Sequence, residues 1–442
     1  MASAPRPSIP KTSKDQHRHR SEQDASKNRY ETAFRRIDLQ GPSDVSMELL
    51  LSRTRKTMKD VIVIHPRFTL YGGGEVVGLH VCKVLQELGY HVYLACDNFN
   101  PEEADRHFGL GGIMKNCTHV PVLGEFRPFL TKQFLAYQRA IYSVRLLNSI
   151  KIPNDCEFVF STQSMLYFKP NLFNLCVAYD LADFFYGHQI GSAMKKSLIK
   201  SLYYSPLQRL YKHYAIRMSE KDNFFIPLSH AIEESMDALC YPHSPSVFPP
   251  CEMSFRPMPK EKYAINTSRL VPSKRLEDFI EIARKLPHYK FVIVGKMSKT
   301  EEALFPRYKE KLIDSLPPNA KLVEGIVRQC KELVECAKLY LYPSVELGVS
   351  ISLGQAMGAG CIPVTPSAGG GAEMVQASGT GYMYRSLEEA ARLVEQAFES
   401  DAVKDSPEYI AEKAQMFSAD SFDDQIRKII SERVAELPST RP

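Results

Sequence analysis

The stretch PSVELGVSISLGQAMGAGCIPVTPSAGGGAEMV, residues 343–375, is the part of the chain around which the rest is organised. It indicates a strand end, a turn with Glu346 and Gly348, a helix over Ser352–Gly358, a strand over Cys361–Thr365 and a glycine-rich turn. Where a strand leads through such a turn into a helix, the first helical N–H groups lack partners and the helix dipole favours an anion. Two successive junctions suggest a doubly anionic ligand such as a nucleotide diphosphate. An ordinary pair of α/β loops is the alternative.

The composition is typical of a soluble globular protein, with 442 residues of which 44% are hydrophobic and 24% charged. This length predicts two to three domain-sized units. No apolar run is long enough to span a bilayer, and the basic N-terminus lacks the apolar core of a signal peptide. The ten cysteines form no CxxC pair, which indicates neither a zinc site nor a disulfide framework. We therefore expect a cytoplasmic protein with buried thiols.

The formal charge of +5 is concentrated at the N-terminus, where residues 1–58 hold twelve Lys and Arg against seven Asp and Glu. The remainder is close to neutral, so nucleic acid is not an expected partner of the folded part. Residues 1–45 are rich in Ser, Pro and basic residues, which predicts a disordered basic tail. This tail is either a loose tether to anionic lipid or nucleic acid, or a solvated segment.

Two series of alternating strand and helix patterns divide the chain. The first begins with the β-branched run Lys59–Ile64, followed by the turn YGGGE at 71–75 and an amphipathic helix. The second begins at Tyr263–Thr267, after a linker with six prolines at Tyr241–Pro259. Repeated strand–helix–strand units predict parallel sheets covered by helices. We therefore expect an α/β fold with two Rossmann-like domains facing across a cleft, where a ligand would meet the glycine turns of both.

The predicted organisation has five parts. These are a disordered tail at 1–45, an N-terminal Rossmann-like domain at 46–245, a Pro-rich linker at 246–260, a C-terminal Rossmann-like domain at 261–420 and a terminal helix at 421–442 that packs back on the N-terminal domain. One helix is expected over Glu301–Ser315. The basic amphipathic segment Ala193–Met218 is either a helix lying on an anionic membrane or a surface helix with a packed apolar stripe.

A pair of cations follows the first strand of the second domain, in the segment SRLVPSK at 268–274. Arg269 and Lys274 lie at the carboxyl end of a parallel strand, from which both would reach into the cleft. They could neutralise a pyrophosphate. Because a leaving diphosphate gains charge in the transition state, such contacts would accelerate a reaction as well as bind the ligand.

These motifs together resemble the GT-B glycosyltransferases of family 4, which are retaining enzymes that use nucleotide sugars. The similarity runs through most of residues 59–437. The segment that leads into the central helix looks most like that of mannosyltransferases that elongate lipid-linked oligosaccharides. The matching segments are Gly72–Glu75, Ser246–Pro250, Asn266–Lys274, Val292–Gly295, Tyr342–Ser344, Gln355–Pro363 and Gly370–Glu373. The resemblance implies an N-terminal acceptor domain and a C-terminal nucleotide-sugar-binding domain.

The resemblance also implies roles for individual residues. Arg269 and Lys274 would bind the donor diphosphate, Gly73 and Gly74 would close over it, and the backbone of Gly348–Ser350 would meet the sugar and phosphate. The expected catalytic residues are Arg269, Lys274, Glu346 and Asp180, and the expected donor-binding residues are Gly73, Gly74, Gly348, Val349, Ser350, Ile351, Gln355, Gly370 and Glu373. No metal or other cofactor is expected, because the two cations and the helix N-termini replace it.

The sequence departs from the family pattern at four positions: Leu347, Gln355, Tyr179 and Ser350, the last of which stands where the family has its turn glycine. Leu347 stands where the first of two paired glutamates belongs, with Glu346 beside it, and Gln355 stands at the second, which normally holds the ribose hydroxyls. Tyr179 and Asp180 replace a His-Asp or His-Tyr pair. Gln can still accept and donate hydrogen bonds to a ribose.

The sequence thus predicts a retaining transferase that moves a hexose from a nucleotide diphosphate sugar to a glycan or lipid-linked acceptor, working at the cytosolic face of a membrane. One alternative is a catalytically weak or inactive subunit that keeps the fold and binds a nucleotide sugar or a partner. Another is an enzyme of this fold with a nucleic-acid acceptor.

Overall fold

The computed structural model describes residues 58–68, 72–124, 134–163, 172–178, 198, 201–207, 209 and 223–436. The described residues from Lys59 onward belong to one compact unit. The predicted tail, Tyr179, Asp180 and most of the basic segment 193–218 lie outside the described residues. In the described part, no helix has the length and apolar character needed to cross a membrane.

The first half of the described chain, here called the N-domain, is built on a six-stranded parallel sheet. Its strands are β1 (Asp60–Ile64), β2 (His91–Cys96), β3 (Thr118–Pro121), β4 (Cys156–Ser161), β5 (Asn174–Ala178) and β6 (Asn223–Pro227), and its helices are α3 (Gly73–Glu87), α4 (Pro101–Phe108), α5 (Gly111–Lys115), α6 (Leu135–Ser149) and α10 (His230–Ala238). Four of the five β1 residues are buried, as expected of a β-branched strand in the middle of a covered sheet.

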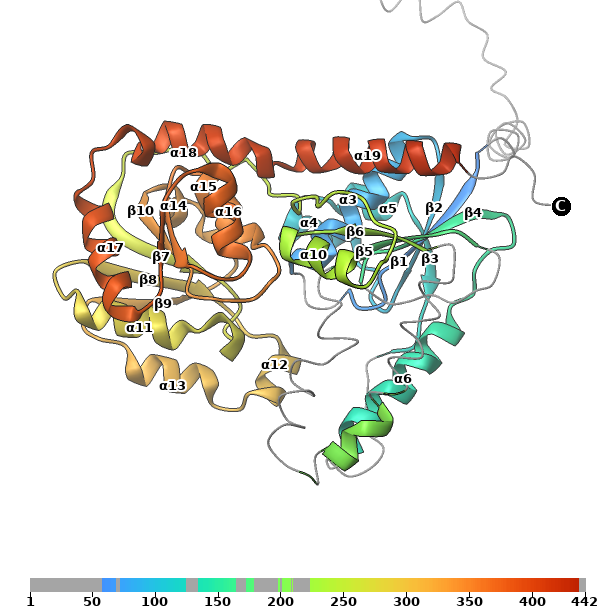
Figure 1. Cartoon of the computed structure of the whole chain (residues 1–442), viewed down its shortest axis with the longest axis horizontal. Helices are drawn as coiled ribbons and strands as arrows, with labels where there is room; N and C mark the ends of the chain where they lie inside the picture. Colours follow the sequence, from blue (N-terminus) through green and yellow to red (C-terminus); the bar gives the residue numbers. More distant parts are fainter. Residues whose placement is uncertain are drawn as a thin grey trace, which may run out of the picture. The chain divides into compact units, whose positions relative to one another are not determined.

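The second half, here called the C-domain, repeats this plan with another six-stranded parallel sheet. Its strands are β7 (Glu261–Thr267), β8 (Lys290–Gly295), β9 (Ala320–Glu324), β10 (Ala337–Leu341), β11 (Ile362–Pro366) and β12 (Tyr382–Tyr384). Its helices are α11 (Leu276–Lys285), α12 (Lys299–Leu304), α13 (Tyr308–Ser315), α14 (Lys331–Glu335), α15 (Ile351–Gly358), α16 (Gly370–Ser378), α17 (Leu387–Glu399) and α18 (Pro407–Ala414). Figure 1 shows helices packed against the sheet in each half.

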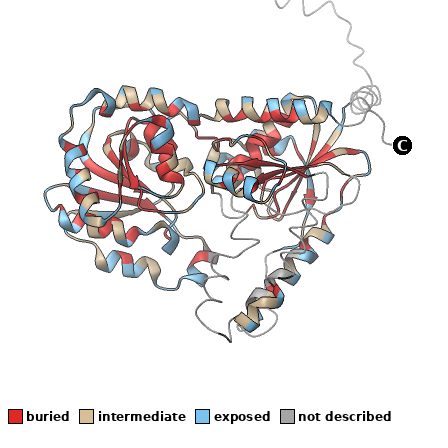
Figure 2. Ribbon diagram, in the orientation of Figure 1, coloured by how far each residue is buried: buried red, intermediate tan, exposed pale blue. Residues whose placement is uncertain are grey.

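Both sheets have the same strand order. The first sheet runs β3-β2-β1-β4-β5-β6, and the second runs β12-β11-β10-β7-β8-β9. When the second sheet is listed from its other edge and its strands are numbered from β7 as the first, the two orders are identical. In such sheets ligands bind outside the carboxyl ends of the strands, where the order reverses, which is beside β1/β4 and β7/β10 here. The buried positions gather in the strands and on the inward faces of the helices (Figure 2). The predicted α/β fold with two Rossmann-like domains is confirmed.

The last helix, α19 (Ala419–Ala435), follows the C-domain in sequence but contributes to the core of the N-domain. Phe422, Ile426 and Ile430 are buried there among residues of α3 and of the first sheet. The buried Asp423 carboxylate lies 2.8 Å from His80 Nδ1 and accepts a bond of 2.7 Å from Lys83 Nζ, both on α3. Apolar burial and a charged contact thus join the end of the chain to its first helix.

One predicted element is wrong. The single helix expected over Glu301–Ser315 is two helices, α12 and α13. Pro306 lies between them, and Arg307 adopts a left-handed conformation with φ of 61°. Proline disfavours the helical conformation in the residue before it and lacks the N–H that a continuous helix would use, so the chain turns here.

Candidate active site

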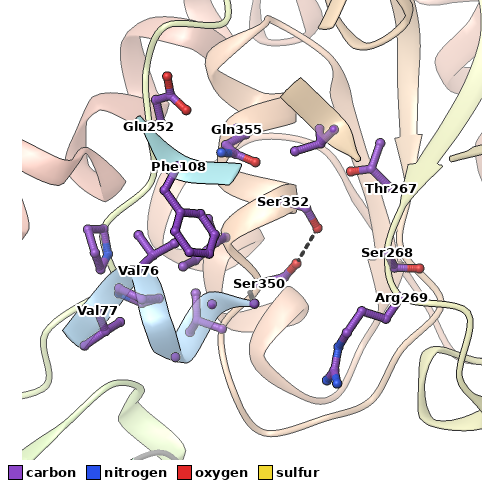
Figure 3. Close-up of a pocket in the computed structure, with 18 of the residues that line it drawn as sticks. Val76, Val77, Phe108, Glu252, Thr267, Ser268, Arg269, Ser350, Ser352 and Gln355 are labelled. Atoms are coloured by element: carbon purple, nitrogen blue, oxygen red, sulfur yellow. Dashed lines mark hydrogen bonds between the residues drawn. The ribbon is translucent and has the colours of Figure 1, made fainter. Parts of the chain in front are cut away.

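A cavity of about 1300 Å³ is lined by residues of both domains. The C-domain contributes the ends of β7 and β8 and the start of α15, and the N-domain contributes the start of α3 and the end of α4. Figure 3 shows Arg269, Ser350 and Ser352 on one side and Val76, Val77 and Phe108 on the other. The cavity therefore lies at the strand ends where a ligand was predicted.

The start of α15 presents unpaired donors to this cavity. Ser350 caps the helix, and its hydroxyl accepts a bond of 3.3 Å from the N–H of Leu353. The N–H groups of Ile351 and Ser352, the first two of the helix, are left without helical partners. The Ser350 and Ser352 hydroxyls lie 3.1 Å apart (Figure 3), and the buried Tyr340 hydroxyl donates to Ser352 over 2.9 Å. This hydroxyl chain fixes the two serines beside the helix N-terminus.

The start of α3 meets the start of α15 across the cavity. A Cβ atom on Gly73 would lie 3.3 Å from Ile351 Cδ1, so a larger residue there would crowd the contact. Glu75 turns its carboxylate back to accept the Gly72 N–H over 2.9 Å. Two helix N-termini, one from each domain, thus converge on the same space, and both favour an anion through their dipoles.

Arg269 extends into the cavity from the end of β7. Its Nη1 donates to Glu301 Oε1 over 2.8 Å, and the guanidinium remains partly exposed. Glu301 is buried, and its other oxygen accepts from the N–H and hydroxyl of Ser298, which caps α12. A guanidinium carries five N–H donors, of which the Glu301 contact uses one. Figure 3 shows the Arg269 side chain extending from the strand end that also carries Ser268. Glu301 thereby holds one edge of the guanidinium and leaves another for a ligand.

Lys274, the second predicted cation, also lines the cavity and forms an ion pair with Glu346. Burial alone would lower the pKa of Lys274, but Tyr342 and Glu346 outweigh it and raise that pKa. Burial alone would raise the pKa of Glu346, but its attraction to Lys274 lowers it. Both groups are therefore charged at neutral pH. A ligand phosphate would have to share Lys274 with this carboxylate.

Most of the predicted site residues meet at this cavity. Those that line it are Arg269, Lys274, Glu346, Gly73, Gly74, Gly348, Val349, Ser350, Ile351 and Gln355. Leu347 lines it as well. Gln355 is buried on α15, and its side chain lines the cavity from that helix.

Two predicted donor-binding residues do not line this cavity, and one predicted catalytic residue cannot be placed. Gly370 and Glu373 are not among the described residues that line the cavity. Gly370 packs behind the Glu346 loop, and Glu373 contacts α10 of the N-domain because its side chain leaves α16 on the side facing that helix. Asp180, the fourth predicted catalytic residue, lies outside the described residues.

Several cavity residues were not predicted from the sequence. They are His80, His107, Phe108, Glu252, Lys296, Glu301 and Arg328. Lys296 directly follows the end of β8, a signal that could have identified it. His107 donates its Nδ1 hydrogen to the carbonyl of Glu103, so its Nε2 accepts from Lys296 Nζ at 3.2 Å across the domains. Burial also lowers the pKa of His107, which favours this neutral form.

The comparisons with known proteins agree with this architecture. The structure is similar to sucrose-phosphate synthase from Thermosynechococcus elongatus, with a TM-score of 0.64 and 12% identity over 85% of this chain and 99% of that one. It is similar to Anabaena HepE in complex with UDP and glucose (TM-score 0.57, 14% identity, 86% and 100% covered). It is also similar to WaaG, a glycosyltransferase involved in lipopolysaccharide biosynthesis (TM-score 0.58, 19% identity, 84% and 99% covered). The chain therefore has the GT-B fold of glycosyltransferases.

A family model gives the finer assignment. Residues 254–417, which cover most of the C-domain, match the model described as glycosyl transferases group 1. No curated protein matches the sequence. Among the described residues, no group of three or more His, Cys, Asp or Glu side chains is arranged to hold a metal ion.

Proposed function

We propose that this protein is a retaining transferase of the family 4 type that moves a hexose from a nucleotide diphosphate sugar to a glycan or lipid-linked acceptor. The observation that carries the proposal is the convergence of Arg269, Lys274 and two helix N-termini on one cavity. The match of residues 254–417 to the group 1 family model supports a nucleotide-sugar donor. The UDP and glucose named in the HepE complex make UDP-glucose a first donor to test.

The chemistry follows from where charge develops. When the bond between the sugar and the diphosphate breaks, the leaving diphosphate gains negative charge. Arg269 and Lys274 would then bind it more strongly than the intact donor, which lowers the barrier. The acceptor oxygen forms the new bond to the sugar and gives its proton to the departing phosphate. Since the two cations supply the positive charge, we expect turnover to be unaffected by EDTA.

A second function, a subunit of this fold with weak or no activity, is favoured by a specific observation. Glu346 is engaged with Lys274, and Leu347 and Gln355 stand where paired carboxylates are expected. Such a subunit would bind the nucleotide sugar or a partner without transferring the sugar.

Isothermal titration with UDP, GDP and ADP tests the proposal, using wild type and the double variant Arg269→Ala/Lys274→Ala. We expect micromolar binding of one nucleotide, lost in the variant, and turnover with the matching sugar nucleotide. Binding without turnover would support the subunit. No binding of any nucleotide at millimolar concentration would overturn the donor site itself.

The acceptor is proposed to be presented at a membrane, on the cytosolic side. All ten cysteines are unpaired thiols, which supports a reducing compartment. In the described part of the basic segment, Leu198 and Leu202 are 91% and 80% exposed, as a lipid-facing helix would require. Sedimentation with anionic and neutral vesicles tests this. Binding to anionic vesicles that is lost in Leu198→Ser/Leu202→Ser supports it, and equal recovery of both proteins in the supernatant contradicts it.

A further inference from the structure

The carboxylate of Glu373 connects the two domains. Glu373 lies in the first turn of α16, and its Oε1 accepts the backbone N–H of His230 over 2.5 Å. His230 is the first residue of α10 in the N-domain, and the next N–H, of Ala231, also acts on the carboxylate. The hydroxyl of the cap residue Ser229 accepts the N–H of Ile232. The two helical N–H groups that Ser229 leaves unpaired are therefore satisfied from the other domain.

The same turn of α16 also supports the loop that carries Glu346. The N–H of Gly370 donates to the carbonyl of Glu346 over 2.8 Å. A Cβ atom on Gly370 would lie 2.4 Å from the carbonyl oxygen of Gly348, so the loop packs directly on the start of the helix. Gly369, with φ of 85°, provides the left-handed turn that makes this approach possible. One helical turn thus contacts both α10 and the loop whose carboxylate pairs with Lys274.

The α10 end of this connection also reaches the cavity. Leu228, directly before the α10 cap, lines the cavity, whereas Glu373 itself does not. A shift of α10 relative to α16 would therefore move a cavity wall and strain the Glu346 loop at the same time. Charge complementarity between a carboxylate and a helix N-terminus gives this contact a preferred geometry that apolar packing lacks.

We propose that Glu373 is a positioning residue that couples the closure of the two domains to the Glu346 loop, and so to Lys274. The functional part of this inference rests on the proposed nucleotide-sugar chemistry. The coupling between α10 and the Glu346 loop can be measured without any ligand. The coupling and the proposed nucleotide-sugar chemistry can therefore be contradicted separately.

The variants are Glu373→Ala, Glu373→Gln and, as a matched control, Glu389→Ala. Glu389 makes a similar contact within the C-domain alone, where its carboxylate accepts the N–H of Arg385 over 2.8 Å. Thermal melting first checks that all variants fold. Hydrogen exchange is then measured for peptides covering 229–233 and 344–349, and small-angle scattering gives the radius of gyration, each without ligand and with UDP, GDP and ADP.

We expect Glu373→Ala to accelerate exchange at least fivefold in both segments and to increase the radius of gyration. Glu373→Gln, which keeps an acceptor oxygen, should fall between this variant and wild type, and Glu389→Ala should match wild type in both segments. With an active donor, kcat should fall more than tenfold in Glu373→Ala while KM for the donor changes less than threefold.

Faster exchange at 229–233 alone, with 344–349 and the radius of gyration unchanged, would overturn the proposal and reduce Glu373 to a local cap. An unliganded protein that behaves as expected but binds none of the nucleotides would instead contradict the proposed function and leave the coupling established.

Discussion

Arg269 divides its guanidinium between a buried carboxylate and the cavity. Glu301 holds Nη1 at 2.8 Å and is itself fixed by Ser298. A cation held in this way is already oriented before the ligand arrives, so less conformational entropy is lost on binding. The proposed contribution of Arg269 to diphosphate binding therefore depends on Glu301, a residue that need not contact the ligand.

The substitution Glu301→Gln tests this dependence. It removes the charge that orients Arg269, and we expect about 3- to 10-fold weaker binding of the nucleotide diphosphate, corresponding to roughly 1 kcal/mol. Isothermal titration measures the change, and Glu302→Gln on the exposed side of α12 is the control. Equal affinity of Glu301→Gln and wild type would show that Arg269 orients itself.

His65 gives the molecule a pH dependence. It is fully buried at the end of β1, and burial lowers its pKa from 6.5 to about 3 despite an opposing backbone hydrogen bond at Arg67. Between these two values the unfolded chain binds a proton that the folded one does not, so stability rises with pH across this range. The slope is at most about 1.4 kcal/mol per pH unit.

We therefore expect denaturant midpoints to increase from pH 5 to pH 7 in wild type, and to increase less in His65→Leu. The quantity to compare is the slope of the denaturant midpoint against pH, because the packing change caused by the substitution shifts all midpoints of the variant equally. Parallel slopes in the two proteins would mean that His65 does not carry the pH dependence.

At the scale of elements, the glycines within helices differ in what surrounds them. In α3, a Cβ on Gly78 would lie 2.9 Å from His65 Nδ1, whereas in α5 a Cβ on Gly112 would have nothing within 4 Å. Alanine normally stabilises a helix relative to glycine by about 1 kcal/mol. The close approach of α3 to β1 should reverse that sign at Gly78.

We expect Gly78→Ala to lower the free energy of unfolding by about 1–3 kcal/mol through overpacking, and Gly112→Ala to raise it by up to about 1 kcal/mol. Urea titrations of the two variants measure both values. A stabilised Gly78→Ala protein would show that His65 moves aside without cost.

The same elements show which features could be predicted from the sequence alone. The strands follow from short apolar runs such as Lys59–Ile64, because buried parallel strands tolerate little else. Arg269 and Lys274 are identifiable because they follow a strand end, where ligands of this fold bind. Phe108 and Glu301 reach the cavity only through tertiary packing, which no local pattern encodes. Glu373 follows a glycine turn, as a ligand-binding residue would, yet its rotamer directs it to α10.

At the scale of the whole molecule, α19 ties the end of the chain to the N-domain. Asp423 is 4% exposed and faces both His80 and Lys83, while Phe422 and Ile426 fill the core around it. Burial alone would lower the pKa of Lys83, but Asp423, Glu87 and Asp420 raise it, so Lys83 is charged at neutral pH. Since His80 also lines the cavity, this contact links the C-terminal helix to the site.

Asp423→Asn should destabilise the protein by about 2–3 kcal/mol, because Lys83 loses its buried partner. Asp424→Asn is the neighbouring control. Its carboxylate is exposed and forms an ion pair with Arg427, so a change within about 0.5 kcal/mol is expected. Calorimetry of the two variants decides whether the contact stabilises the whole molecule or only the helix.

The return of α19 also has a consequence for synthesis on the ribosome. Phe422, Ile426 and Ile430 belong to the N-domain core, yet they are translated only after every strand of the C-domain. At a synthesis rate of about 5–20 residues per second, α19 is completed some ten seconds or more after β6, the last strand of the N-domain. During that interval its apolar α3 face is uncovered, which makes the nascent chain a substrate for chaperones that recognise exposed hydrophobic surface.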